Sequence, residues 1–181
     1  MKDFLFEKCL LSNVRQITPK INKGKKDLFI KNYERSLYVD HGIDFVPTEE
    51  YQITEEQLIF RGIHLQYHKP QKRVITVLAG EAYITVVNLD KKSSQLGQYE
   101  TFLLKGQDPK LIYVPEWFGV ATISLKNNTT ISVASDGLYY EEYSGGIRYD
   151  DATLNIQWFV QDFCVSEKDS NLLTFDEYMC L

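Results

Sequence analysis

The chain has 181 residues, of which 44% are hydrophobic and 13% aromatic, and this composition excludes a disordered chain and allows one buried core. Its net charge of -5 excludes the basic surface of a typical nucleic-acid-binding protein. No hydrophobic run approaches the roughly 20 residues of a membrane span, and the amino terminus has no signal-peptide cleavage pattern, so we expect a cytoplasmic protein without a membrane partner. Three scattered cysteines, an odd number, predict reduced thiols instead of a disulfide framework.

The first part of the chain predicts short elements and one polar segment. In chain order we expect a strand or strand pair within residues 1–18, a turn at 23–26, a strand at 27–31 and a short helix at 32–38. Asn32 is the expected N-cap of that helix, with Glu34 behind it. The polar run at residues 48–57, TEEYQITEEQ, predicts a surface loop.

From Ile59 onward the sequence predicts strands almost throughout. Residues 73–90, RVITVLAGEAYITVVNLD, are β-branched and apolar, and they predict one continuous buried strand pair with a break at Gly80. Further strands are expected at 98–104, 111–114, 120–124 and 130–133. Strands that recur about every ten residues between turn signals predict an all-β sandwich or barrel. A short helix capped at Thr174 is expected near the end.

A polar cluster, Arg61-Gly62-Ile63-His64, stands directly before this run of strands. Glycine allows the backbone to pass close to another chain segment, arginine suits an anion, and histidine titrates near neutral pH. An isolated histidine is more often structural than functional, so the cluster alone identifies no activity.

The histidines do not predict a metal site. The chain has three of them, His41, His64 and His68, and no His-x-His motif. On an extended strand His64 and His68 would lie ~13 Å apart, too far to share one ion. We therefore expect chemistry without a metal and without a cofactor.

A series of motifs carries a family resemblance. In chain order they are RGIHLQ, GEAYITVVNLD, YVPEWF, GIRYDD followed by NIQW, and SEKD. They resemble RGLHYQ, GEVFDVAVDLR, IPEGFAHG, GIRWDDP and SEKD of the dTDP-4-dehydrorhamnose 3,5-epimerase family, the RmlC-like cupins. The resemblance implies one cupin domain over residues 1–181, an all-β double-stranded β-helix or jelly roll with short peripheral helices. It also implies a homodimer that pairs sheet edges, which would cover strands that otherwise aggregate.

The resemblance implies an epimerase that removes a proton beside the ketone of a nucleoside-diphosphate 4-keto-6-deoxy sugar. His64 falls on the family's catalytic base, and Asp169 in SEKD on the carboxylate that orients it. Tyr139 falls on the tyrosine acid that returns a proton to the opposite face, and the adjacent Tyr140 is the alternative if the loop shifts by one residue. Arg73 replaces the lysine that steadies the enolate.

Several positions match the substrate-binding side of the family. Arg61 and Lys26 are the expected diphosphate clamp, and Lys26 replaces an arginine there. Gln66, Lys72 and Lys168 lie within or beside the matching motifs and are further candidates for substrate binding. The expected partner is thus a nucleotide sugar and no nucleic acid.

Other positions depart from the family. Val120 stands where the family has a second histidine, and residues 47–52 replace its QDN segment. Asn22 and Lys31 stand where the family uses phenylalanine and glutamate toward the thymine base. These departures favour epimerisation at one centre, C3 or C5, and leave the base and the sugar open. Two alternatives also remain: a 4-keto sugar ketoisomerase, and a cupin that binds a sugar nucleotide without turning it over.

Overall fold

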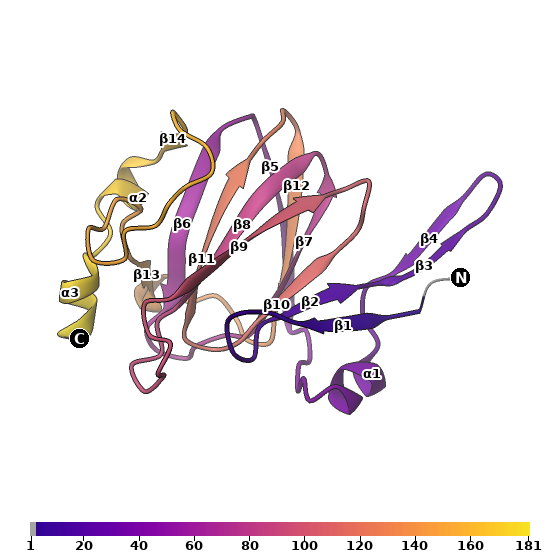
Figure 1. The fold of residues 1–181 in the computed structure, drawn as a ribbon, viewed down its shortest axis with the longest axis horizontal. Helices are drawn as coiled ribbons and strands as arrows, with labels where there is room; N and C mark the ends of the chain where they lie inside the picture. The colour runs from indigo at the N-terminus through magenta and orange to yellow at the C-terminus, as the bar shows by residue number, and fades with distance from the viewer. Residues whose placement is uncertain (1–2) are drawn as a thin grey trace.

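The computed structural model describes residues 3–181 as two facing β-sheets with short helices at their edges (Figure 1). The first sheet has the order β1 (Leu5–Lys8), β2 (Arg15–Thr18), β10 (Leu111–Val114), β7 (Arg73–Ala79), β12 (Thr129–Ser135) and β5 (Glu49–Glu55). The second has the order β13 (Ser144–Gly146), β6 (Ile59–Gln66), β11 (Phe118–Ser124), β8 (Glu81–Asn88) and β9 (Tyr99–Lys105), and β14 (Cys164–Val165) pairs with β6 in parallel. Consecutive strands alternate between the sheets from β5 to β8 and from β9 to β12, so the predicted all-β jelly roll is confirmed.

The predicted strand pair over residues 73–90 is wrong in one respect. Its two strands, β7 and β8, lie in different sheets: β7 pairs with β10 and β12, whereas β8 pairs with β9 and β11. Gly80 turns the corner between them with a φ of +73°, and a Cβ there would lie 2.8 Å from the Cα of Thr129. Most of both strands is buried, and a buried apolar sequence gives no information about which neighbour a strand pairs with.

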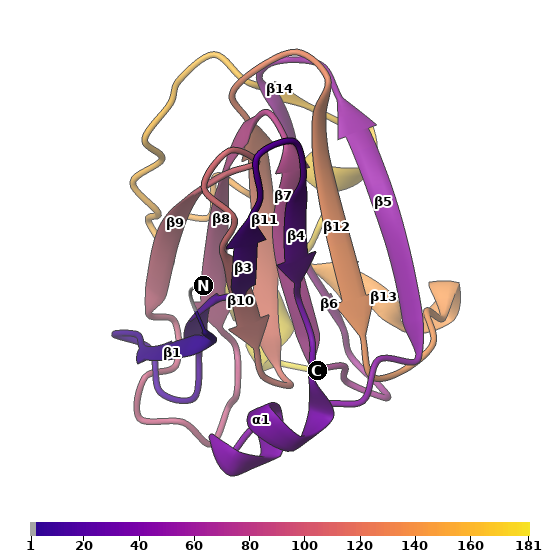
Figure 2. The same cartoon turned by 90° about the vertical axis from the view of Figure 1, so that its right-hand side faces the viewer.

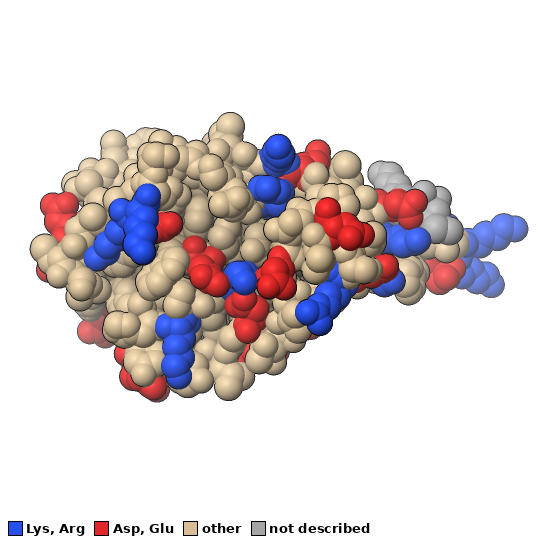
Figure 3. Space-filling view, turned by 90° about the horizontal axis from the view of Figure 1, so that it is seen from below, with Lys and Arg blue, Asp and Glu red and all other residues tan. Residues whose placement is uncertain are grey.

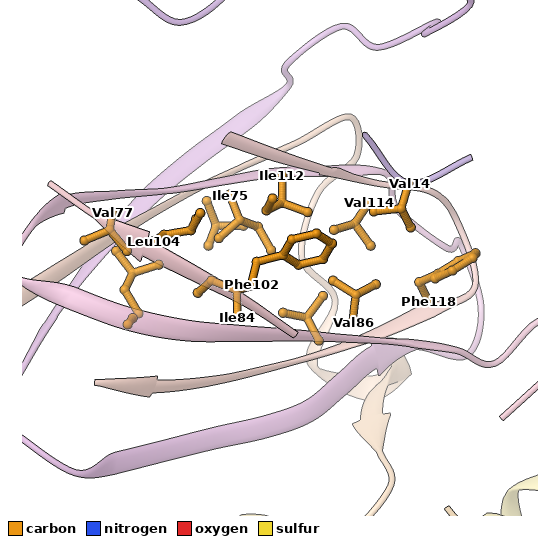
Figure 4. Packing of buried hydrophobic residues seen from close by; sticks show 14 of the residues in the cluster. Val14, Ile75, Val77, Ile84, Val86, Phe102, Leu104, Ile112, Val114 and Phe118 are labelled. Atoms are coloured by element: carbon orange, nitrogen blue, oxygen red, sulfur yellow. The ribbon is translucent and has the colours of Figure 1, made fainter. Parts of the chain in front are cut away.

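The inner faces of the two sheets bury an aliphatic core (Figure 4). Ile75 and Ile112 of the first sheet pack toward Ile84 and Phe102 of the second, and all four side chains are at most 9% exposed. Burial of each such side chain contributes about 1.5–3 kcal/mol to stability. The core leaves open a cavity between the sheets that β5, β6, β7, β11 and β12 line.

The carboxyl-terminal segment covers the outer face of the second sheet, next to β6 (Figure 1). It contains the short helices α2 (Glu167–Ser170) and α3 (Phe175–Met179). Ser166 is the N-cap of α2 and its hydroxyl accepts the backbone N–H of Asp169. Thr174 caps α3, as the sequence predicts, and forms a capping box with Glu177. The packing of this segment brings α2 against β6.

A hairpin of β3 (Lys20–Lys23) and β4 (Leu28–Lys31) projects from the body of the molecule (Figures 1 and 2). Helix α1 (Arg35–Asp40) follows it, with Glu34 at the N-cap position. The prediction of Asn32 as N-cap is wrong, because Asn32 still lies in the extended segment, where its carbonyl accepts a hydrogen bond from Tyr38 at 3.0 Å. A one-turn 3-10 helix, η1 (Glu141–Tyr143), precedes β13.

The surface loop predicted at residues 48–57 is mostly a strand. β5 is the edge strand of the first sheet and pairs with β12 along its whole length (Figure 2). Its alternation of side chains is hidden in the sequence because Glu50, Gln52 and Thr54 face solvent on one side. The other side carries Tyr51, Ile53 and Glu55 toward the interior, and Tyr51 is still 44% exposed. An edge strand with one solvated face therefore looked like a polar loop.

Candidate active site

Strand β6 directs Arg61 and His64 into the same cavity by means of a bulge. In a regular strand, residues three apart point to opposite faces of the sheet. Here His64 pairs with Val120 and Arg61 with Thr122, so β6 uses one residue more than β11 between these two pairs. The extra residue resets the alternation, and both side chains line the space between the sheets.

Gly62 lies in this bulge, and only glycine fits there. Its φ is +132°, and a Cβ would lie 2.6 Å from the Cα of Ala121 on β11. Its backbone N–H donates a hydrogen bond of 3.1 Å to Oδ2 of Asp169. The close approach expected from the glycine in the Arg-Gly-Ile-His cluster is thus an approach to β11.

His64 and Asp169 form a hydrogen-bonded pair. Nε2 of His64 lies 2.7 Å from Oδ1 of Asp169, although 105 residues separate them in the chain. Asp169 is 3% exposed, and the side chain of His64 is 36% exposed. Because an ionised carboxylate only accepts hydrogen bonds, Nε2 carries the hydrogen and Nδ1 keeps a free lone pair.

The environment of Asp169 keeps it ionised. Burial works against the charge, but the hydrogen bond to His64, the N–H of Gly62 and the charge of Arg61 outweigh it and hold the pKa of Asp169 below its ordinary value. An ionised Asp169 fixes the tautomer of His64 and stabilises the imidazolium that forms when Nδ1 takes up a proton.

The cavity beside this pair is lined from both sheets. Its lining residues are Tyr51, Ile53, Arg61, His64, Arg73, Ile75, Val120, Thr122, Ile131 and Val133. Val120 lies directly across the strand pair from His64 and is 7% exposed. The wall next to the imidazole is therefore apolar at this position, which favours a dry site.

Arg73 enters the cavity from β7, but its terminal nitrogens are already bonded to the backbone. Nη1 donates to the carbonyl of His64 at 3.2 Å, and Nη2 donates to the carbonyl of Phe118. Burial lowers the pKa of Arg73, while nearby Tyr51 favours its charged form. Arg73 thus supplies a buried positive charge and ties β7 to β6 and β11, with Nε left without a partner among residues 3–181.

Arg61 is held by an acidic partner. It forms an ion pair with Glu55 of β5, whose side chain is 2% exposed, while the side chain of Arg61 is 49% exposed. Within the described residues, Oε2 of Glu55 has no hydrogen-bond partner. The charge of Arg61 is thus compensated at the cavity wall, which differs from a free diphosphate clamp.

Tyr139 lies beside the cavity and not in its lining. Its side chain is 51% exposed, and its N–H donates to Glu49 at the start of β5. Gln66 and Gln71 hold the segment before and after it, because both donate to the carbonyl of Leu138 and Gln66 also accepts the N–H of Tyr140. Gln66, a candidate for substrate binding, is 7% exposed and is engaged in holding this segment.

Three lysines that the sequence singled out are not brought into the cavity. Lys72 is engaged with Asp136 and Glu116, at 3.4 Å and 3.6 Å. Lys168 is exposed on α2, and Lys26 is exposed at the tip of the β3–β4 hairpin.

Tyr51 is the cavity residue that sequence reasoning missed. It was assigned to a surface loop, and the signal that could have found it is the spacing of two between Tyr51, Ile53 and Glu55. Burial raises the pKa of Tyr51, and Arg73 opposes this shift, so the phenol is neutral near pH 7.

The remaining polar candidates do not form a metal centre in the described chain. Residues 3–181 contain no cluster of three or more His, Cys, Asp or Glu side chains that could hold an ion. His68 lies beyond the end of β6, with its ring 5.4 Å from that of Tyr143. None of the helices described is long and apolar enough to cross a membrane.

The chain is similar in sequence and in fold to known epimerases. The family model described as dTDP-4-dehydrorhamnose 3,5-epimerase matches residues 8–177. A Methanothermobacter thermautotrophicus protein of that name is 26% identical over 174 residues, which span 94% of each chain. A dTDP-6-deoxy-D-glucose-3,5-epimerase from Legionella pneumophila, solved with dTDP-4-keto-L-rhamnose, superposes with a TM-score of 0.92 at 22% identity and covers 96% of this chain and 94% of that one. A 3'-monoepimerase from Streptomyces bikiniensis, solved with dTDP-quinovose, gives 0.84 at 20% identity, with 92% and 86% covered. The chain therefore belongs to the dTDP-4-dehydrorhamnose 3,5-epimerase family.

Proposed function

We propose that this protein is an epimerase that acts on a nucleoside-diphosphate 4-keto-6-deoxy sugar. The observation that carries the proposal is the His64–Asp169 pair, 2.7 Å apart, beside a cavity between the sheets. The family match over residues 8–177 and the epimerase names of the relatives support the same reaction. A dTDP sugar bound to the similar structure from Legionella pneumophila supports a nucleotide-linked sugar as substrate.

His64 is the base in this proposal. Nδ1 takes the proton from a carbon beside the ketone, and Asp169 stabilises the resulting imidazolium. The electron pair of the broken C–H bond forms an enolate, which the buried charge of Arg73 favours. Tyr139 returns a proton to the opposite face of the carbon, so that the centre inverts.

Inversion at one centre is the second part of the proposal. Val120 places an apolar side chain opposite His64. A drier wall stabilises charge less well, so it gives less support to the enolate that inversion at a second carbon would need. The 3'-monoepimerase of Streptomyces bikiniensis has a similar fold, which supports single-centre chemistry on this scaffold.

We place the working enzyme in the cytoplasm as a homodimer of a one-domain chain, residues 1–181. The β3–β4 hairpin projects from the body of the molecule (Figure 1), and it carries Lys23, Lys25 and Lys26 at or beside its tip, none of which lines the cavity. Figure 3 shows basic side chains at this end of the molecule. A diphosphate held by Lys26 would therefore belong to substrate in another copy. The three cysteines are unpaired among the described residues, which suits a reducing compartment.

A wash-in of deuterium tests the proposal. The protein is incubated in D2O with dTDP- and UDP-linked 4-keto-6-deoxy sugars, and label at C3 and C5 is followed by mass spectrometry and proton NMR. We expect label at one carbon in clear excess. His64→Ala should lower the exchange rate by about 10²–10⁴-fold, and His68→Ala should leave it unchanged because His68 lies outside the cavity.

The possible outcomes separate the alternatives. Absence of exchange with every nucleotide sugar would leave a binding protein, which the assembled base and its carboxylate do not favour. Movement of the ketone to another carbon would identify a ketoisomerase. Equal and rapid label at both carbons would refute the preference for one centre while leaving the epimerase intact.

A further inference from the structure

Tyr51 and His64 line the same cavity from the two different sheets. Tyr51 lies on β5 of the first sheet, whereas His64 lies on β6 of the second sheet. Tyr51 pairs with Val133 on β12, and Val133 pairs in turn with Ile75 on β7. Arg73 lies two residues before Ile75 on β7 and therefore on the same inner face. A sugar ring between the sheets would therefore meet the imidazole on one side and the phenol on the other, with the guanidinium of Arg73 reaching across to the backbone of His64.

The cations of the cavity are only partly available as donors. The terminal nitrogens of Arg73 donate to the carbonyls of His64 and Phe118 and its Nε is fully buried, while Arg61 is paired with Glu55 through its Nε. The developing charge on a ketone oxygen needs a donor that is free and aimed at it. Tyr51 makes no side-chain hydrogen bond to another of the described residues, so its hydroxyl is available.

We propose that Tyr51 is a catalytic residue that donates a hydrogen bond to the ketone oxygen of the substrate as this oxygen becomes an enolate. This inference rests on the proposed epimerase function and adds to it the group that stabilises the enolate. Arg73 acts behind the phenol as a fixed positive charge that strengthens its donor.

The step balances without a further reactant. His64 takes the proton from carbon, the C–H electron pair forms the C=C bond, and the C=O π pair moves to the oxygen that Tyr51 hydrogen-bonds. Tyr51 keeps its proton, because burial raises its pKa above the ordinary value for a phenol. The ketone forms again when Tyr139 protonates the carbon, and solvent then restores His64 and Tyr139.

Tyr51→Phe tests this role, with Tyr83→Phe as the matched control. Both remove one phenol hydroxyl, but Tyr83 lies on β8, outside the cavity lining, with its ring stacked on that of Phe159. Loss of one oxyanion donor lowers kcat by about 10²–10³-fold. We expect this loss in kcat for deuterium exchange in Tyr51→Phe, with KM little changed and with exchange and inversion reduced together. Tyr83→Phe should stay within about threefold of the wild type, because a change outside the cavity is nearly neutral.

The comparison with Tyr139→Phe separates enolate stabilisation from proton donation. Tyr139→Phe should exchange label and fail to invert, whereas Tyr51→Phe should be slow in both. Replacement of Tyr51 by 3-fluorotyrosine, a stronger donor of the same shape, should restore exchange. A Tyr51→Phe protein with normal kcat, or with raised KM alone, would overturn the inference and leave the epimerase standing. A wild type without exchange would instead overturn the proposed function on which it rests.

Discussion

Asp169 makes the hydrogen-bonded pair of His64 and Asp169 sensitive to acid. Its pKa lies below the ordinary value of about 3.9 because hydrogen bonds from His64 and Gly62 and the charge of Arg61 outweigh burial. A depressed carboxyl pKa contributes stability that is present above the unfolded value and is lost as the pH falls through the folded value.

Asp169→Asn should therefore flatten the acid limb of the stability curve. The wild type should lose free energy of unfolding below about pH 4, and the variant should lose less, since it has no carboxyl to protonate at this position. Urea unfolding from pH 2 to 7 measures the difference, and Asp176→Asn, on the exposed face of α3, is the control. At neutral pH the variant should turn over more slowly than the wild type and faster than His64→Ala, because an amide can bond the ring and cannot stabilise the imidazolium. Parallel acid limbs in the two proteins would mean that Asp169 is not held in its ionised form.

At the scale of single residues, the sequence predicted those site residues that lie in short local motifs. His64 and Asp169 could be assigned because each lies in a short characteristic motif, and the structure brings the two together. The direct roles expected for Arg73 and Gln66 could not be judged, since their partners are backbone carbonyls of distant strands. Tyr51 was missed because it lines the cavity only when β5 pairs with β12, and this pairing cannot be read from the sequence.

At the scale of elements, the β6 bulge decides which side chains face the cavity. Gly62 has a φ of +132° and no room for a Cβ. Gly62→Ala should cost about 1–3 kcal/mol in backbone strain and a similar amount from the contact with β11. It should also displace His64 from Asp169 and reduce exchange. Chemical denaturation and the exchange assay measure the two effects.

Gly42→Ala is the control for this prediction. Gly42 also has a positive φ, +76°, but nothing lies within 4 Å of a Cβ there. Its replacement should cost about 1–2 kcal/mol from the left-handed conformation alone and leave exchange intact. Equal losses of stability and activity at both glycines would show that the close approach to Ala121 does not position the pair.

Which strands exist was more predictable than how they pair. Short β-branched segments at regular spacing identified β7 to β12, because that pattern follows from one strand alone. Pairing depends on the crossing of the chain between two sheets, which is why β7 and β8 were joined wrongly and β5 was not recognised. In sequence, an edge strand with one polar face resembles a polar loop, and only its pairing with the neighbouring strand distinguishes the two.

At the scale of the whole molecule, the projecting hairpin suggests that a site is shared between copies. If Lys26 serves the cavity of a partner, two defective variants should complement each other. A dimer of one His64→Ala chain and one Lys26→Glu chain contains one site with both defects and one site with neither. Random pairing should then restore about a quarter of the wild-type rate.

Co-expression of the two variants with different affinity tags measures this recovery, and sedimentation equilibrium measures the oligomeric state. Each variant expressed alone is the control. A mixed dimer as inactive as its parents would show that the hairpin serves its own cavity, and a Lys26→Glu protein with normal activity would show that it serves none.

The carboxyl-terminal segment also determines when the site comes into being. Asp169 follows His64 by 105 residues, which at ribosomal rates corresponds to about 5–20 s of synthesis. During that interval the imidazole exists in a nascent chain that lacks its carboxylate. Full proton-transfer competence therefore arrives late, when α2 packs against β6, and a chain cut before Ser166 keeps the segments of all the described strands but lacks the carboxylate. Such a clipped copy should act on the sugar more slowly than a chain that carries Asp169.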